Sequence, residues 1–107
     1  MDFGLVLVTA SSAEEAEAIA QVLIEKRLAA CVTLLPVQSL YRWQGKLERS
    51  QEYQLLIKTD LAQFKALETQ VQAIHSYEVP EIIAVPILQG SPAYLAWLQS
   101  SLSPDTP

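Results

Sequence analysis

The sequence predicts an α+β domain of the ferredoxin-like type: a βαββαβ sandwich with a long central hairpin and a short C-terminal helix. Apolar runs typical of strands and amphipathic patterns typical of helices follow one another in that order. With 107 residues, the chain is long enough for one domain. We expect this domain to span residues 1–99. Residues 100–107 are rich in Ser, Pro, Asp and Thr, and we expect a flexible tail there.

The first strand and helix follow from local patterns. Residues 3–9 form an apolar run rich in β-branched side chains, which is typical of a strand buried on both faces. Ser11 or Ser12 then begins a helix, because Glu14 or Glu15 lies three positions later and completes a capping box. Apolar residues recur on one face of this predicted helix: Ala16, Ile19, Ala20, Leu23 and Leu28.

A long β-hairpin is predicted in the middle of the chain. Residues 29–43 have an extended character, with Pro36 at an edge position or a bulge. Gly45 supplies the turn, and residues 47–58 return as the next strand. Both strands are far longer than the usual length of about 5–6 residues, so the hairpin should project past a small domain. Its far end carries large side chains: Tyr41, Trp43, Leu47 and Tyr53. We therefore expect it to pack on neighbouring copies of the chain.

The second half completes the predicted fold. Asp60 caps a second helix with an apolar inner face made by Leu61, Phe64, Leu67, Val71 and Ile74. Residues 81–88 form the fourth strand. Ser91 and Pro92 begin the third helix, since proline is tolerated in a first helical turn. We expect four residues to anchor this helix: Tyr94, Leu95, Trp97 and Leu98.

Composition limits the function classes. The net charge of −5 argues against nucleic acid as a partner, because phosphates would repel an acidic surface. No segment has the length of a membrane span, and the start Met1–Asp2 lacks the basic patch of a signal peptide. The single cysteine cannot form an intramolecular disulfide. These features predict a cytoplasmic protein that binds neither membranes nor nucleic acid.

Three motifs in a fixed order carry a family resemblance. HxYExPEI covers residues 75–82, AACVT covers residues 29–33, and YRWQGK covers residues 41–46. Together they resemble the CutA family of divalent-cation tolerance proteins, over about residues 3–98. The resemblance implies the same ferredoxin-like fold, a homotrimer, and weak binding of Cu²⁺ or another divalent metal that folding does not require.

The metal ligands that this resemblance suggests are His75, Glu78 and Glu81, with Cys31 as a weaker candidate. Each has a structural alternative. His75 could bond the last carbonyls of a helix, Cys31 could be a small buried apolar residue, and the glutamates could be solvated or paired. Some family members have two consecutive histidines here and a cysteine in the first strand. This chain departs from both, and it has Ser76 where the family more often has proline.

A second set of residues matches family positions that lie around a cleft between subunits: Tyr41, Arg42, Trp43, Lys58, Tyr77 and Glu81. The set suits either packing between subunits or a pocket for a small polar ligand. The first hypothesis is therefore a metal-binding tolerance trimer. The alternatives are a signalling trimer similar to PII proteins, which senses a small molecule in the cleft, and a stable assembly without a specific ligand. No P-loop, CxxC, HExxH or other catalytic motif occurs, so we expect no enzyme.

Overall fold

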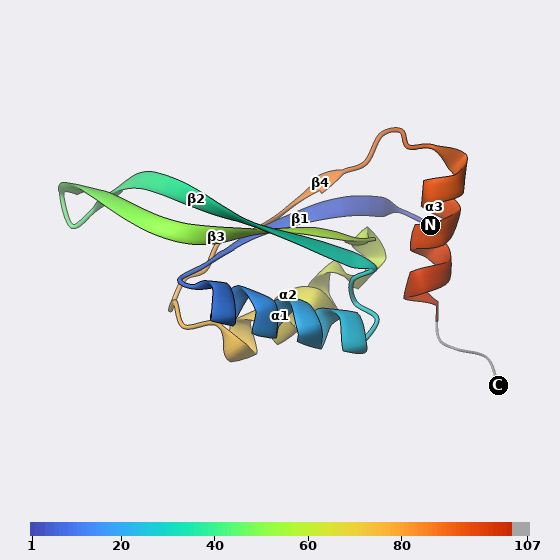
Figure 1. Ribbon diagram of the computed structural model, residues 1–107, viewed down its shortest axis with the longest axis horizontal. Coiled ribbons are helices and arrows are strands. Elements are labelled where there is room, and N and C mark those ends of the chain that lie inside the picture. The colour runs from blue at the N-terminus through green and yellow to red at the C-terminus, as the bar shows by residue number, and fades with distance from the viewer. Residues whose placement is uncertain (104–107) are drawn as a thin grey trace.

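The computed structural model describes residues 1–103; residues 104–107 lie outside the described part of the chain. It confirms the predicted order of elements and the fold class (Figure 1). The elements are β1 (Phe3–Ala10), α1 (Ala13–Glu25), β2 (Cys31–Trp43), β3 (Lys46–Asp60), a 3₁₀ turn (Leu61–Gln63), α2 (Phe64–Ile74), β4 (Ile82–Pro86) and α3 (Pro92–Leu102). Within residues 1–103, no helix is long and apolar enough to cross a membrane.

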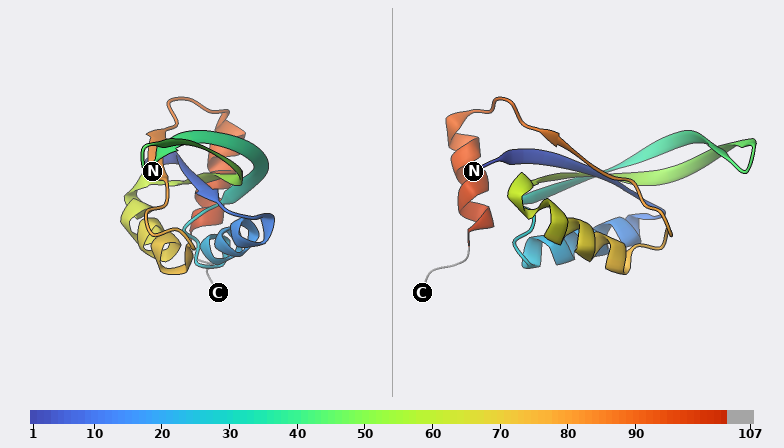
Figure 2. Two further views of the ribbon diagram at one scale, coloured as in Figure 1. Left: turned by 90° about the vertical axis from the view of Figure 1, so that its left-hand side faces the viewer. Right: turned by 180° about the vertical axis from the view of Figure 1, so that it is seen from behind.

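The four strands form one antiparallel sheet in the order β2-β3-β1-β4. Helices α1 and α2 cover one face, and the opposite face, which we call the open face, carries no helix along most of its length (Figures 1 and 2). Strand side chains alternate between these faces. The core between sheet and helices is built from fully buried residues, among them Val6, Val8, Ile19, Leu23, Leu55, Ile57, Leu67 and Val71.

The hairpin of β2 and β3 extends past the rest of the sheet. Its register runs from Cys31 opposite Lys58 to Trp43 opposite Lys46. Strand β1 pairs with β3 only as far as Tyr53. Beyond that point, in residues 37–52, β2 and β3 pair only with each other, and we call this part of the hairpin the arm. The arm accounts for much of the 51 Å length of a molecule only 28 and 22 Å across (Figure 2). At its tip, Gly45 has a φ of 78°, as the turn prediction requires.

The C-terminal region corrects the prediction of a tail over residues 100–107. Residues 100–102 belong to α3, where Leu98 and Leu102 are buried. The Arg27 guanidinium also donates a hydrogen bond to the carbonyl of Ser101 at 3.1 Å. The two aromatic residues expected to anchor this helix, Tyr94 and Trp97, are instead exposed and in contact with each other. The helix is therefore anchored by leucines, and the rest of the predicted tail, residues 104–107, lies outside the described residues.

Candidate functional site

The segment between α2 and β4, residues 75–81, contains most of the predicted metal ligands. His75 follows the last turn of α2, and its side chain is completely buried. Its Nε2 donates a hydrogen bond to the carbonyl of Thr9 at 2.7 Å, and its Nδ1 accepts one from the Tyr77 N–H at 3.0 Å. The bonds identify a neutral imidazole with its proton on Nε2, because a carbonyl can only accept and an N–H can only donate. Both nitrogens are thus occupied, and a metal at His75 would have to replace one bond.

Glu15 fastens this segment to the start of α1. Its Oε1 accepts hydrogen bonds from the Ser11 N–H at 2.9 Å and hydroxyl at 2.8 Å, and its Oε2 accepts one from the Ser76 N–H at 2.7 Å. Burial by itself would raise the pKa of Glu15, but the hydrogen bonds from Ser11 and Ser76 outweigh it and lower the pKa to about 2. Proline at position 76 could not donate this bond. Ser76 therefore gives the segment a contact that a proline would remove.

Tyr77 fastens the same segment to the root of the arm. Its hydroxyl donates a hydrogen bond to Oε2 of Glu52 at 2.7 Å, and Glu52 is only 7% exposed. Burial and the Glu52 carboxylate raise the pKa of Tyr77 well above its ordinary value, so the phenol stays protonated and remains a donor. The ring also contacts the His75 ring, with 4.8 Å between centroids. Residues 75–77 are thus fixed by α1, β1 and β3 together.

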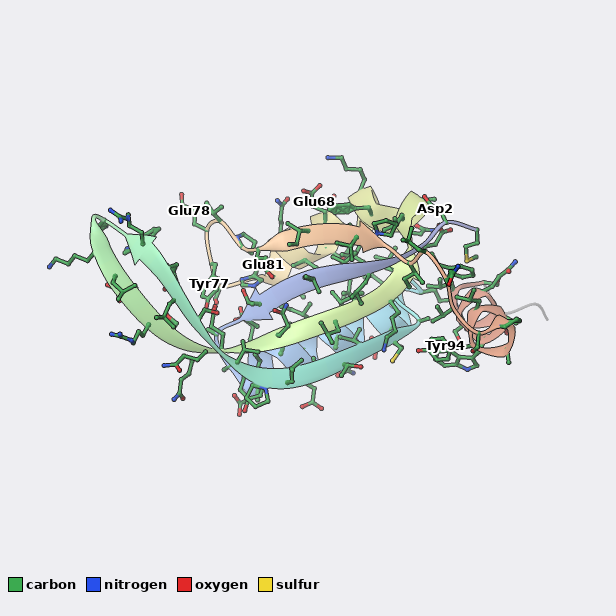
Figure 3. All side chains as sticks on the ribbon, turned by 90° about the horizontal axis from the view of Figure 1, so that it is seen from above. Asp2, Glu68, Tyr77, Glu78, Glu81 and Tyr94 are labelled. Atoms are coloured by element: carbon green, nitrogen blue, oxygen red, sulfur yellow. The ribbon has the colours of Figure 1, made fainter. Side chains whose placement is uncertain are left out.

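Glu78 and Glu81, in contrast, are exposed. Figure 3 shows Tyr77, Glu78 and Glu81 together at the end of the sheet where the arm begins, with Tyr94 at the opposite end. The nearest hydrogen-bond partner of Glu81 is the Gln54 amide, 3.5 Å from its Oε2. Within residues 1–103, no three His, Cys, Asp or Glu side chains lie close enough to hold a metal ion. One chain therefore does not bring His75, Glu78 and Glu81 together as a preformed site.

The weaker candidate, Cys31, lies elsewhere. It begins β2 and is half-buried rather than fully buried, which corrects the expectation of a core residue. Its Sγ is 3.9 Å from the Lys58 ammonium. This ammonium would repel a metal cation bound to the same sulfur. Cys31 is also placed at the other end of the sheet from Thr9, the residue that His75 contacts.

The predicted cleft residues are separated within one chain. Tyr41, Arg42 and Trp43 lie near the arm tip, where the Tyr41 hydroxyl is 2.9 Å from that of Ser50. Lys58 lies opposite Cys31, eleven residues along β2 from Arg42, or about 36 Å at the usual rise of a strand. A cleft that joins both groups therefore needs the arm of another copy.

Sequence reasoning missed two residues that organise the site, Glu52 and Gln54. Glu52 receives the Tyr77 hydroxyl, and the Gln54 amide donates to the Val8 carbonyl at 2.8 Å. Nothing in their local pattern distinguishes them from other polar strand residues. Glu15 was predicted only as one of two candidate acids of a capping box, and the 3.1 Å bond from its N–H to Ser12 Oγ confirms Ser12 as the cap. Its contact with Ser76 spans 61 residues and had no sequence signal.

Comparisons with known proteins give one consistent result. The family model described as CutA1 divalent ion tolerance protein matches residues 4–101. The divalent-cation tolerance protein CutA of Thermus thermophilus is 48% identical over 98 residues, which cover 91% of this chain and 95% of that protein. The solved structure of CutA from Xylella fastidiosa has a TM-score of 0.92 at 46% identity and covers 96% and 100% of the two chains. A solved Archaeoglobus fulgidus structure, described as a periplasmic divalent cation tolerance protein, also has a TM-score of 0.92, at 40% identity over 94% and 99% of the chains.

Proposed function

This chain belongs to the CutA1 divalent ion tolerance family, and on that premise we propose that it acts as a cytoplasmic homotrimer that binds divalent cations, Cu²⁺ among them, weakly and reversibly. The proposed role is binding rather than catalysis. The family relationship supports a function in metal tolerance in general.

One observation carries the assembly: the arm exposes large apolar side chains at its tip. Trp43 is 60% exposed and Leu47 is 62% exposed, and Leu40 and Tyr41 beside them are exposed as well. The open face is apolar too, with Ile83, Val85 and Leu35 exposed. Patches of this kind are uncommon on monomers and are typical of interaction surfaces.

The two apolar surfaces suggest how copies would meet. The arm and the open face are different parts of the chain, so an arm-to-face contact is heterologous, and such a contact forms a ring when the rotation between copies closes on itself. Three is the number of copies that the resemblance to the CutA family implies. Burial of the arm would remove the aggregation hazard of a long exposed hairpin. It would also bring Tyr41, Arg42 and Trp43 of one copy towards residues 75–81 or Lys58 of another.

The divalent cations are proposed to bind where the arm of one copy would meet residues 75–81 of another. Glu78 and Glu81 are exposed there and supply carboxylate oxygens. His75 joins them only if it gives up one of its two hydrogen bonds. Because two exposed carboxylates make an incomplete ligand set, binding would be weak in one chain and stronger where a second copy adds ligands.

Light scattering tests the assembly. We expect the wild type to have three times the 11.8 kDa mass of the chain. The variant Trp43→Ser/Leu47→Ser should dissociate at concentrations where the wild type stays assembled, because it loses apolar contact area. Ile24→Ser is the control, since Ile24 is an exposed apolar residue on α1, away from the arm. A monomeric wild type would refute the assembly.

Calorimetric titration with Cu²⁺ in a non-coordinating buffer tests the ion site. Saturable binding should be lost in Glu78→Gln/Glu81→Gln and kept in Glu17→Gln/Glu25→Gln, which removes two carboxylates from α1. His75→Gln decides whether His75 is a ligand. The same heat of binding in all these proteins would mean that Cu²⁺ binds non-specifically to surface carboxylates. That result would refute the proposal.

A further inference from the structure

One hydrogen bond joins the root of the arm to the segment that follows α2. The arm begins at Glu52, where the sheet narrows to two strands because β1 ends opposite Tyr53. Glu52 is buried, and its carboxylate accepts the bond from the Tyr77 hydroxyl at 2.7 Å. Within residues 1–103, apart from strand pairing, no other hydrogen bond or ion pair links residues 37–52 to another part of the chain. The Tyr77–Glu52 bond therefore helps to set how the arm leaves the sheet.

Tyr77 also occupies His75. Its backbone N–H donates to His75 Nδ1 at 3.0 Å, while Nε2 of the same ring donates to the Thr9 carbonyl. A cation on Nδ1 would have to displace the Tyr77 N–H, because both need the same lone pair. A cation on Nε2 would move the ring proton to Nδ1, where it would face that N–H as a second donor. Either way of binding a cation to His75 therefore displaces the backbone of Tyr77.

We propose that a divalent cation bound to His75 loosens the arm, because displacement of Tyr77 breaks its hydrogen bond to Glu52. This inference rests on the proposed cation binding and adds a means of regulation to it. A looser arm is a poorer partner for another copy, so cation binding and assembly would oppose each other. The coupling is reciprocal: whatever fixes the arm through Glu52 weakens binding of the cation by the same factor.

Calorimetric titration with Cu²⁺ gives the first test. Binding to the wild type includes the cost of breaking the Tyr77–Glu52 bond, and this cost is absent in Tyr77→Phe. We therefore expect Tyr77→Phe to bind Cu²⁺ about 5-fold more tightly, or better. Glu52→Gln keeps an acceptor oxygen for the hydroxyl and should give a smaller increase. The control Tyr94→Phe removes a hydroxyl at an exposed position of α3 and should bind within about 2-fold of the wild type.

Hydrogen exchange followed by mass spectrometry gives the second test, and its main comparison needs no variant. In the wild type, saturating Cu²⁺ should speed the exchange of amides in residues 37–52 about 5-fold or more, and should leave α1 unchanged. In Tyr77→Phe, the arm should already exchange fast and should respond little to Cu²⁺. The protein concentration is one at which light scattering gives the same mass with and without Cu²⁺, so that dissociation is not mistaken for loosening.

Failure of this inference can be told apart from failure of the proposed function. Saturable Cu²⁺ binding that leaves exchange of the arm unchanged would overturn the inference alone. Equal affinities of Tyr77→Phe and Tyr94→Phe would do the same, and so would full binding by His75→Gln, because the cation would then not depend on the ring. Absence of saturable binding to the wild type would overturn the proposed cation site and the inference with it.

Discussion

Glu15→Gln tests whether the segment 75–81 is held by the carboxylate of Glu15, whose side chain is 13% exposed. The amide keeps an acceptor oxygen for Ser11, but its NH₂ group would face the Ser76 N–H, so two donors would meet. The pKa of Glu15 lies at about 2 instead of its ordinary 4.5. At about 1.4 kcal/mol for each pKa unit, this difference corresponds to about 3 kcal/mol of folding stability. We expect Glu15→Gln to lose about 1–3 kcal/mol at pH 7.

The pH dependence provides the sharper test. A carboxyl group with a lowered folded pKa contributes stability that is fully present above its unfolded pKa. For Glu15, the contribution is complete above about pH 4.5 and is lost as pH falls towards about 2. The difference between wild type and Glu15→Gln should therefore be largest at pH 7 and close to zero near pH 2.

Guanidinium unfolding followed by circular dichroism, at one fixed protein concentration, measures this difference from pH 2 to 7. Glu14→Gln is the matched control, because Glu14 is an exposed acid in the same first turn of α1. It should cost less than about 0.5 kcal/mol. A difference for Glu15→Gln that does not change with pH, or that equals the control, would refute the reasoning.

Two further predictions follow from single contacts. Tyr77→Phe leaves the buried Glu52 without its 2.7 Å donor and should lower the free energy of unfolding by about 1–3 kcal/mol. The control Tyr94→Phe, at an exposed position, should change it by less than about 0.5 kcal/mol. Equal effects of the two variants in denaturant titrations would contradict the role of Glu52. Gly4→Ala places a methyl group against the side chain of Leu61 and should lower the free energy of unfolding by about 1–3 kcal/mol. In a double-mutant cycle, the double variant Gly4→Ala/Leu61→Ala should recover part of that loss. If the effects of the two substitutions simply add, the contact with Leu61 is not the cause of the loss.

Local patterns were sufficient for most of the fold. The apolar run at residues 3–9, the Ser12 cap and the turn at Gly45 each act over a few residues, so their structures follow from the sequence. The same reasoning failed at α3. Tyr94 and Trp97 are large apolar residues at helical spacing, yet Leu98 and Leu102 face the domain. The position of the helix against the sheet, which the pattern does not contain, determines which face is buried.

The candidate site was only partly predictable. The sequence identified the segment that contains His75, Tyr77 and Glu81, because polar groups concentrate there before a strand. It could not identify their partners. Glu15 and Glu52 reach this segment from α1 and β3, at separations of 61 and 25 residues. Such contacts depend on strand register and on how the helices lie on the sheet.

The sequence by itself determined the order of elements, the long hairpin and the family, since periodicity, capping and motifs are local properties of the chain. Only the tertiary structure decided that both ring nitrogens of His75 are occupied and that Lys58 lies far from Arg42. The availability of a side chain for a metal or another ligand depends on which groups meet it in space. Those groups come from distant strands, whose pairing is set by burial of the whole core rather than by any one segment.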